Sequence, residues 1–485
     1  MTRLPIGSLL KYWADKDGTA AAITHEGQTV SRADFDAQTN RLARAYEALG
    51  VRQGDLVTIG LPNSIEFYAA AFAVWKLGAT PQPISAKLPP VERQAIVEVA
   101  EPTLIVGAAP GSHGDIICLE AGFQPDPTLS DAPLPEKVSK HWKAPTSGGS
   151  TGRPKIIISG EEGSFPPEIA PLGMETDRVQ LVPGPLYHNA PFSFSARALM
   201  CGNHIIVMTR FDAEETLRLL AEYHVDWVMM VPTMMQRIWR LPKDVRNAYD
   251  LSALRMVLHL AAPCPAWLKE EWINWLGPER IHELYAGTEA QSVTWITGSE
   301  WLDHRGSVGR PMKGGQMKIL GEDGHELPPG QIGEVFMRPD AGVGTTYHYR
   351  GATAKATQDG WESLGDMGYM DEDGFLYLAD RQTDMILSGG ANIYPAEVEA
   401  AIDAFPGVRS SAVIGLPDDD MGNLAHGIVD APDGIELSAL QAHLAENLSR
   451  YKIPRSFEFV SAPVRDDAGK VRRSQLRTER LKAKA

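Results

Sequence analysis

The sequence predicts an α/β fold with a large N-terminal part and a small C-terminal unit. Two patterns predict it. Helical and strand-like segments alternate through the first part of the chain, and after Gly306 short strands are separated by Gly- and Pro-rich turns. With 485 residues, 43% hydrophobic and 22% charged, the chain has the composition of a globular protein and the length for more than one domain.

The N-terminal part opens with a helix that leads into a strand. Apolar residues recur at helical spacing from Phe35 to Leu49, Gly50 is suited to cap this helix, and residues 55–61 form an apolar strand-like run. A second apolar helix begins at Phe67 and ends before Gly78. Further on, strands in residues 204–211 and 225–231 flank a helix over 213–223. Such alternation favours a layered fold with a largely parallel sheet.

The β-rich segment after Gly306 includes strands within residues 314–321 and 333–339. Beyond Arg381 a further unit begins, with a helix over 395–405, a strand over 411–416, a helix over 438–448 and a basic terminal segment. We place the domain boundary near residues 380–384, so that the N-terminal domain covers 1–380 and the C-terminal domain 384–485.

Charge and composition exclude several classes of protein. A net charge of −16 opposes a nucleic-acid partner, which would require clustered basic residues. Cys118, Cys201 and Cys264 are far apart, so buried free thiols are expected rather than disulfides or a zinc site. The N-terminus lacks the long apolar core of a secretion signal, and the most apolar helix, over residues 67–79, is shorter than the ~20 residues of a membrane span. A cytoplasmic protein with no integral membrane segment is expected.

The stretch "APTSGGSTGRPKIIISG", residues 144–160, carries small hydroxyl and glycine residues just before Pro154 and Lys155. Backbone N–H groups of such a loop can surround phosphate oxygens. Because Lys155 follows Pro rather than Gly, the spacing excludes a P-loop. Taken alone, the stretch could equally be a flexible surface turn.

Four further motifs change that balance: "ELYAGTEAQ" (283–291), "WESLGDMGY" (361–369), "DRQTDMILSGGANIYPAEVEA" (380–400) and "DAGKVRR" (467–473). Their order and spacing, together with "TSGGSTGRPK", resemble the adenylate-forming superfamily of acyl-CoA synthetases and luciferases over nearly the whole chain. The resemblance implies a large N-terminal domain of several subdomains, a small mobile α+β C-terminal domain, Mg²⁺ as cofactor, and ATP and CoA as co-substrates.

The resemblance also implies the residues that bind ATP. The β and γ phosphates would lie in the loop of Thr146, Ser147, Gly148, Gly149, Ser150, Thr151, Gly152 and Lys155. The adenine would lie between Tyr285 and the loop around Ala262, and Ala286 and Gly287 would also belong to the nucleotide site. Asp366 and Arg381 would contact the ribose, Thr288 the α-phosphate, and Glu289 the magnesium ion, which prefers hard oxygen ligands beside phosphates.

Catalysis and movement are assigned in the same way. Lys470 would stabilise the charge that develops between the acid and the α-phosphate, and His188 would approach the acid's carboxylate. Gly389 and Gly390 would lie beside the CoA tunnel, and Thr383 stands where relatives often carry Asp or Lys as the hinge. If the motifs are left aside, His188 is interpreted as a structural histidine and Lys470 as a solvent-exposed lysine.

The substrate is expected to be an apolar carboxylic acid, bulky or polycyclic. Seven of the eleven tryptophans lie between Trp227 and Trp301, and the segment "PLYHNAPFSF" (185–194) lacks the Asp with which amino-acid-adenylating relatives fix an ammonium group. Met229, Met230, Met234 and Met235 are suited either to line an acyl pocket or to fill the core. By resemblance, fatty-acid, bile-acid and other polycyclic-acid CoA ligases are nearest.

CoA is the preferred acceptor, because the relatives that load fatty acids onto carrier proteins usually contain an inserted segment that this chain lacks. An acyl-AMP ligase that loads a carrier protein is the alternative. A non-catalytic nucleotide-binding protein is a more remote one, since Glu289, Asp366, Arg381 and Lys470 are all present. A homodimer is compatible with this assignment.

Overall fold

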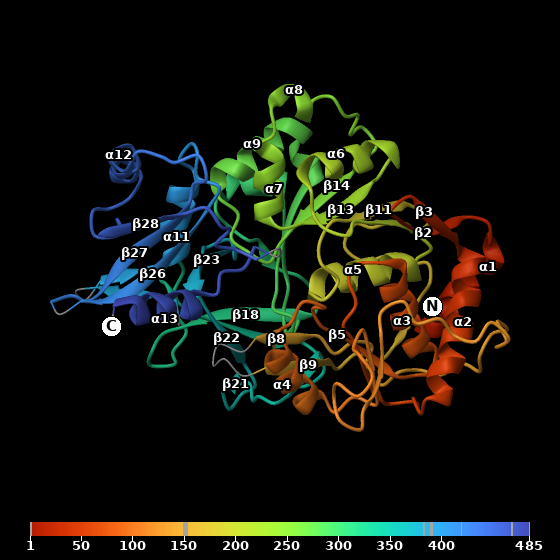
Figure 1. Ribbon diagram of the computed structural model, residues 1–485. Coiled ribbons are helices and arrows are strands. Elements are labelled where there is room, and N and C mark those ends of the chain that lie inside the picture. The colour runs from red at the N-terminus through yellow and green to blue at the C-terminus, as the bar shows by residue number, and fades with distance from the viewer. Residues whose placement is uncertain are drawn as a thin grey trace.

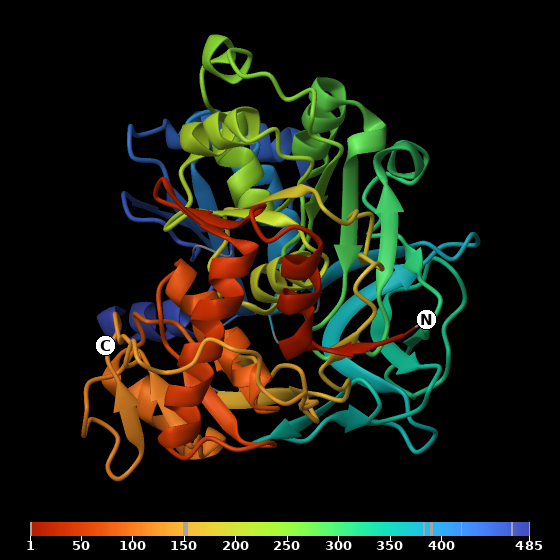
Figure 2. The ribbon, with the colours of Figure 1, turned by 90° about the vertical axis from the view of Figure 1, so that its right-hand side faces the viewer.

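The computed structural model describes residues 2–148, 154–381, 384–388, 391–418, 420–466 and 469–484. It confirms the α/β architecture, in which a large N-terminal part precedes a small C-terminal unit (Figure 1). In Figure 1 the C-terminal unit, in blue, lies on the opposite side of the molecule from the red N-terminal helices. Figure 2 looks from the N-terminal side, with those helices in front.

The central sheet of the described chain has nine strands, in the order β17-β16-β15-β14-β13-β11-β12-β2-β3. The run from β15 to β2 is parallel, and antiparallel pairs close both edges. The strands span Ala21–His25 (β2), Gln28–Ser31 (β3), Val179–Val182 (β11), His204–Val207 (β12), Trp227–Met230 (β13), Met256–His259 (β14), Ile281–Tyr285 (β15), Thr294–Thr297 (β16) and Arg310–Pro311 (β17). The predicted parallel sheet is therefore confirmed.

Helices cover both faces of this sheet, which explains why its strands are continuously apolar. In β13, Trp227 and Met229 belong to one hydrophobic cluster, and Val228 and Met230 to another. The first cluster includes helices α1 (Ile6–Lys16), α2 (Arg32–Ala48), α3 (Ile65–Lys76) and α5 (Asn189–Met200). The second includes α6 (Ala213–Glu222), α7 (Pro232–Trp239) and α9 (Ala266–Leu276).

A second parallel sheet follows the order β5-β4-β6-β7, with strands Thr80–Pro83, Leu56–Ile59, Leu104–Val106 and Ile117–Leu119. This sheet and helix α4 (Pro90–Ala100) lie beside the N-terminal helices (Figure 1). The predicted helix-to-strand transition is confirmed, because α2 ends at Ala48 and Gly50 follows with a φ of 101° before β4 begins. α3 has 12 residues, and no helix in the described part of the chain is both long and apolar enough to span a membrane.

Two larger antiparallel sheets also belong to the N-terminal part, besides the short antiparallel pair of β1 (Leu4–Pro5) and β10 (Ser164–Phe165). One contains β8 (Thr146–Gly148), β9 (Pro154–Ser159) and β20 (Tyr347–Arg350). The other contains β18 (Gly315–Leu320), β19 (Gly333–Pro339), β22 (Glu362–Met370), β21 (Lys355–Ala356) and β23 (Leu376–Arg381). The β-rich segment predicted after Gly306 is confirmed, and β20 brings part of it against the strands that flank the glycine-rich loop.

Short elements fill the connections. They are β1 (Leu4–Pro5), β10 (Ser164–Phe165), α8 (Lys243–Arg246), a 3₁₀ helix (Pro278–Arg280) and α10 (Gly298–Asp303). All three cysteines are free; Cys118 and Cys201 are buried as predicted. Cys264 is partly exposed, because it lies in the loop between β14 and α9 rather than in a packed element.

The C-terminal unit has its own core. Strands β26 (Ser410–Asp418), β27 (Gly422–Asp430) and β28 (Ser456–Val460) form a sheet, and β24 (Ile386–Ser388) pairs with β25 (Ala391–Ile393). Helices α11 (Pro395–Asp403) and α12 (Leu437–Asn447) match the predicted helices within two residues. The basic terminal segment forms helix α13 (Arg473–Lys484). The boundary near residues 380–384 stays a prediction.

Replacement of Phe72 by Ala tests the packing of the N-terminal helices. Phe72 is fully buried on α3, and its ring meets Phe35 of α2 edge-on at 5.8 Å. We expect the cavity to lower the free energy of unfolding by about 3–5 kcal/mol, measured as a lower thermal midpoint. Val91→Ala is the control, because Val91 is 82% exposed and its loss should be nearly neutral. Equal midpoints for the two variants would contradict this account.

Candidate functional site

The predicted site residues gather at one edge of the central sheet. Strands β11, β14 and β15 belong to the same parallel run, so their carboxyl ends point to the same edge. The loops that follow them carry His188, Ala262 and the segment from Ala286 to Ala290. Ligands of open α/β sheets bind outside the carboxyl ends of the strands, so this edge is the place to look for ATP.

Glu289 lies at the centre of the site. Its side chain is buried, and its Oε1 accepts hydrogen bonds from Lys155 Nζ at 3.1 Å and from the Tyr349 hydroxyl. Lys155 Nζ also donates to the Tyr349 hydroxyl at 2.9 Å and lies 4.1 Å from its ring centroid. Burial, and then the charge of Glu289, raise the pKa of Tyr349, which keeps that hydroxyl a donor. Three distant parts of the chain therefore meet at one carboxylate.

Tyr349 was not predicted from the sequence. The aromatic–polar alternation of "YHYR" in residues 347–350 indicates a strand with both tyrosines on one face, but nothing in it identifies β9 as the partner strand.

The turn that carries Glu289 leaves little room for a side chain at Gly287. A Cβ on Gly287 would lie 2.9 Å from Glu289 Oε2 and would collide with Leu364 of β22. The backbone then closes a turn in which Ala290 N–H donates to Gly287 O at 3.1 Å. Ala286 packs against the first hydrophobic cluster, and Thr288 is partly exposed at the top of the turn. Gly287 thus permits Glu289 to point back toward Lys155.

The glycine-rich loop is described only at its two ends. Gly149, Ser150, Thr151 and Gly152 lie outside the described residues, and Ser147 and Gly148 are described only as backbone of β8. Ser147 pairs with Lys155 across the β8–β9 ladder, so the loop joins two adjacent antiparallel strands. Thr146 Oγ1 accepts a hydrogen bond from Gln82 Nε2 at 3.0 Å, which ties the first strand to β5.

The predicted ribose contacts lie on neighbouring strands. Asp366 of β22 stands opposite Arg381 of β23, whose side chain lies outside the described structure. The Tyr285 hydroxyl donates to Asp366 Oδ2 at 2.6 Å, which links the end of β15 to β22. Gly365 has a φ of 83°, the left-handed region that favours glycine, immediately before Asp366. Tyr285 and Asp366 are thus brought together, as the ATP-binding prediction requires.

Asp466, Gly469 and Lys470 hydrogen-bond to one another and are called here the Lys470 turn; Asp467 and Ala468 lie outside the described residues. Gly469 N–H donates to Asp466 O at 2.8 Å, Asp466 N–H donates to Lys470 O at 2.9 Å, and Lys470 N–H donates to Asp466 Oδ1 at 2.9 Å. A Cβ on Gly469 would lie 3.0 Å from Thr233 Oγ1 of α7, so the turn lies directly against the N-terminal part. Arg465 Nη1 donates to Gly469 O at 3.2 Å and holds the turn from behind.

Glu399 of α11 anchors both sides of this turn. Its buried carboxylate pairs with Arg465 at 2.7 Å and with Arg473 at 2.8 Å, and Arg473 also pairs with Asp384 at 2.8 Å. Burial alone would raise the pKa of Glu399, but the two arginine charges outweigh it and hold that pKa below its usual value. The network connects the Lys470 turn to Asp384, next to the predicted hinge.

His188 lies close enough to the Lys470 turn for the charges of that turn to act on it. It is the N-cap residue of α5, and burial, with the charge of Lys470 adding to it, lowers its pKa to about 4. The charge of Asp466 acts in the opposite direction. His188 Nε2 is buried and makes no hydrogen bond within the described part of the chain. The imidazole is therefore neutral at pH 7.

The structure does not test the roles predicted for the hinge, the CoA tunnel and the acyl pocket. Thr383, Gly389 and Gly390 lie outside the described residues. Met229, Met230, Met234 and Met235 are all buried in the two hydrophobic clusters that cover the central sheet. This packing fits the core-filling alternative and leaves the acyl-pocket alternative a prediction.

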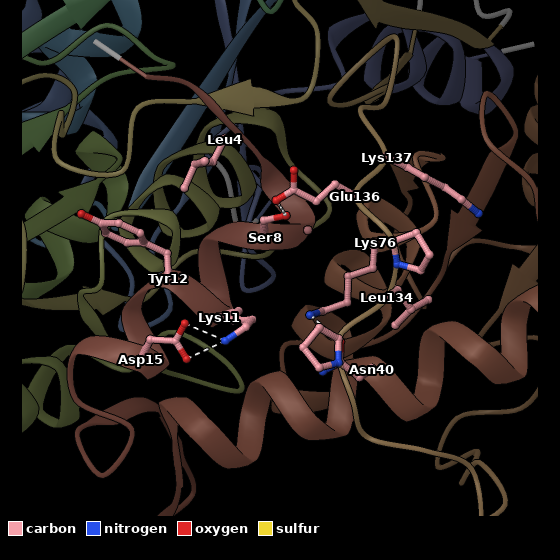
Figure 3. Close-up of a pocket in the computed structure, with 13 residues that line it drawn as sticks. Leu4, Ser8, Lys11, Tyr12, Asp15, Asn40, Lys76, Leu134, Glu136 and Lys137 are labelled. Carbon is pink, nitrogen blue, oxygen red and sulfur yellow. Dashed lines mark hydrogen bonds and ion pairs between the residues drawn. The ribbon is translucent and has the colours of Figure 1, made fainter.

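A separate cleft of about 320 Å³ lies between α1 and residues 133–137, with Asn40 and Lys76 at its base (Figure 3). Lys11 pairs with Asp15 at 2.6 Å, Ser8 donates to Glu136 at 2.9 Å, and Lys76 donates to Asn40 at 2.7 Å (Figure 3). Because these polar groups already form hydrogen bonds and ion pairs with one another, none of them needs a ligand as a partner.

Comparison with known proteins agrees with this geometry. Residues 10–348 match the AMP-binding enzyme family, and residues 397–470 match the AMP-binding enzyme C-terminal domain. A feruloyl-CoA synthase from Amycolatopsis sp. is 32% identical over 476 residues, which cover 94% of this chain and 95% of that protein. A long-chain-fatty-acid–CoA ligase from Mycobacterium tuberculosis is 30% identical over 475 residues, which cover 92% of each.

The fold agrees as well. o-Succinylbenzoate CoA synthetase from Bacillus subtilis, solved with its acyl-adenylate intermediate, has a TM-score of 0.83 at 26% identity, with 98% of each chain covered. The chain belongs to the AMP-binding enzyme family. It is an adenylate-forming acid–CoA ligase that uses ATP, CoA and Mg²⁺, so the alternative of a non-catalytic protein is set aside.

The residues present fit a magnesium ion that is shared with ATP. No group of three or more His, Cys, Asp or Glu side chains that could hold a metal occurs in the described parts of the chain. Magnesium commonly binds through one or two carboxylates together with substrate phosphates. Glu289 can supply such a carboxylate beside Lys155, and the ion would neutralise charge on the phosphates.

Glu289→Gln tests this assignment. The change keeps the shape but removes the negative charge, so we expect magnesium to support pyrophosphate release about 10- to 100-fold less well. The measurement is initial rate against magnesium concentration at saturating ATP. Glu362→Gln is the matched control, because Glu362 is also buried and accepts from Tyr347 at 2.9 Å without contacting Lys155. An unchanged magnesium response in Glu289→Gln would reject the role.

Arg465→Met tests the support of the Lys470 turn. Arg473 still neutralises Glu399 in this variant, so the fold should persist while the turn loses its contact to Gly469 O. We expect pyrophosphate release to fall about five- to tenfold, equivalent to about 1–1.4 kcal/mol. Arg480→Met is the control. It removes the ion pair at 3.0 Å between Arg480 of α13 and Glu458 of β28, and it should leave the rate unchanged. A normal rate in Arg465→Met would contradict the supporting role.

Proposed function

We propose that this enzyme activates an apolar carboxylic acid, bulky or polycyclic, as an acyl-adenylate and transfers it to CoA. The observation that supports the proposal is the position of the Lys470 turn, which lies against Thr233 of α7 and whose charges act on His188. The groups expected to bind the acid, the α-phosphate and the magnesium ion therefore converge from both parts of the chain.

In the first step, a carboxylate oxygen of the acid attacks the α-phosphorus of ATP, and the bond to the pyrophosphate oxygen breaks. Lys470 stabilises the charge that develops between the two groups, and Thr288 holds the α-phosphate. Lys155 and the glycine-rich loop hold the β and γ phosphates. Tyr285 and Ala262 enclose the adenine, and Asp366 and Arg381 bind the ribose. The acid is already ionised at pH 7, so no proton has to be removed from it, and neutral His188 serves only to orient the carboxylate.

In the second step, the thiol of CoA attacks the acyl carbonyl and AMP leaves. We propose domains of residues 1–380 and 384–485, with rotation at Thr383 bringing Gly389 and Gly390 to the CoA tunnel. CoA is favoured over a carrier protein, although one relative, 27% identical over 500 residues, is a fatty acid–[acyl-carrier-protein] ligase from Streptomyces coeruleorubidus. A cytoplasmic location fits the use of ATP and CoA.

An apolar acid is favoured by the side chains of the N-terminal part. Seven of the eleven tryptophans, together with Met229, Met230, Met234 and Met235, lie within residues 227–301. Buried Met234 lies on α7, close to the loop that carries His188. The similar proteins act on feruloyl, long-chain fatty and o-succinylbenzoyl acids, each of which has an apolar body. Pyrophosphate release with aromatic, fatty, steroid and diterpenoid acids would identify the class.

Lys470→Ala separates the two steps. We expect acyl-adenylate formation to fall about 10²–10³-fold, or about 3–4 kcal/mol, because one preorganised transition-state donor is lost. Thioester formation from supplied acyl-adenylate and CoA should continue. The measurement is the rate of each half-reaction with the same acid.

Thr383→Pro is the companion variant. Proline fixes φ near −65°, so this variant should lose thioester formation more than adenylation if the hinge turns there. Equal loss of both steps in folded Lys470→Ala, or normal thioester formation in Thr383→Pro, would overturn the rotation mechanism.

A further inference from the structure

Lys143 is a polar residue at the site that the mechanism above leaves unused. It lies three residues before Thr146 and is only partly exposed. Its Nζ donates to Asn189 Oδ1 at 2.6 Å and to Ser193 Oγ at 2.8 Å, one turn apart on α5. Asn189 directly follows His188. The ammonium therefore lies beside the segment that is expected to receive the acid.

The strand ladder places Lys143 on the same face as Lys155. Pro145 O accepts from Ile157 N–H at 2.9 Å and Lys143 O accepts from Ser159 N–H at 3.0 Å, which extends the β8–β9 pairing. Side chains opposite each other in such a ladder share a face, and alternate residues along a strand do as well. The face that carries Lys155 to Glu289 thus continues to Lys143.

The charge of Lys143 lacks a close counter-ion in the structure. Its two hydrogen-bond acceptors are neutral, and no ion pair of Lys143 occurs within the described residues. Asn189 Oδ1 also accepts from Ser193 Oγ at 3.1 Å, so the acceptors are themselves fixed. Buried ammonium groups are normally paired, because removing the charge from water is costly. The ammonium also lies 4.6 Å from the centroid of the Trp142 ring, which attracts a cation but carries no formal negative charge. An ammonium has three donors, and an anion would supply the missing counter-charge.

Two further observations agree. Burial lowers the pKa of Lys143 to about 7, and the more distant charge of Glu161 opposes that shift. The contacts are made in the first two turns of α5, beginning at its first residue, Asn189, where the helix dipole is positive and favours a negative ligand over a second cation. A bound carboxylate would stabilise the charged form of Lys143 and would interact favourably with the helix dipole.

We propose that Lys143, held by Asn189 and Ser193, binds a carboxylate group of the acid substrate. The proposal builds on the acid-activating function above. The carboxylate is either the reacting one, before it attacks ATP, or a second one on a dicarboxylic acid. The chemistry recognised is the same in both cases, a carboxylate against an ammonium in a partly desolvated site.

Lys143→Met and Lys143→Gln test the proposal, and the glutamine variant keeps a polar side chain that can still reach α5. Acids are compared in matched pairs, beginning with decanoate and decanedioate, and with cinnamate and 4-carboxycinnamate. The KM for each acid and for ATP is measured by pyrophosphate release, with the thermal midpoint as a check of folding. Lys137→Met is the control, because Lys137 lines the separate cleft of Figure 3 and should leave every KM unchanged.

We expect the KM for the acid to rise about tenfold or more while the KM for ATP changes little. A rise for both members of a pair assigns the reacting carboxylate, and a rise for the dicarboxylic acid alone assigns the second one. Unchanged KM values for the acids in the folded variants, or equal rises for acid and ATP, would overturn the inference and leave the proposed function intact. If the native enzyme releases no pyrophosphate with any acid, the proposed function fails and this inference fails with it.

Discussion

The arrangement of the site depends on one buried carboxylate, that of Glu289. Lys155 reaches it from β9, Tyr349 from β20, and Glu289 itself follows β15, so three segments that are at least 60 residues apart in the chain converge there. An unpaired carboxylate in this position would be strongly destabilising, because its desolvation would be uncompensated. The sheet of β8, β9 and β20 must therefore sit against the carboxyl edge of the central sheet, and the triphosphate is expected close to this contact.

Several parts of this arrangement could be predicted from the sequence. Continuous apolar runs such as that of β13 indicate strands covered on both faces, and the ordered motifs indicate which loops belong to the nucleotide site. Tyr349, Arg465 and Glu399 could not be predicted in the same way, because each acts through a partner that is distant in sequence. The alternation in "YHYR" indicates a strand but not its neighbour, and pairing with β9 is what carries Tyr349 to Glu289. Lys143 has no motif at all and is identified only by what its ammonium touches.

Glycine positions connect local and global structure in two places. Gly287 permits the turn that directs Glu289 inward, since any side chain there would meet Leu364 and the carboxylate itself. Gly469 permits the Lys470 turn to lie against Thr233, with a φ of 76° that few other residues adopt readily. In both cases the small residue matters because a second element passes close to the backbone, and that neighbour is visible only in the folded chain.

The arginine network of the C-terminal unit has a consequence for protein engineering. Glu399 joins Arg465, on one side of the Lys470 turn, to Arg473 on the other, and Arg473 reaches Asp384 beside the predicted hinge. A chimera that takes only the final segment from a relative would combine these arginines with a foreign acidic partner, leaving a buried charge mismatched. The exchangeable module is therefore the whole stretch from Asp384 onward, and graft junctions placed between α11 and the Lys470 turn should yield misfolded or poorly coupled hybrids even where both parents are active.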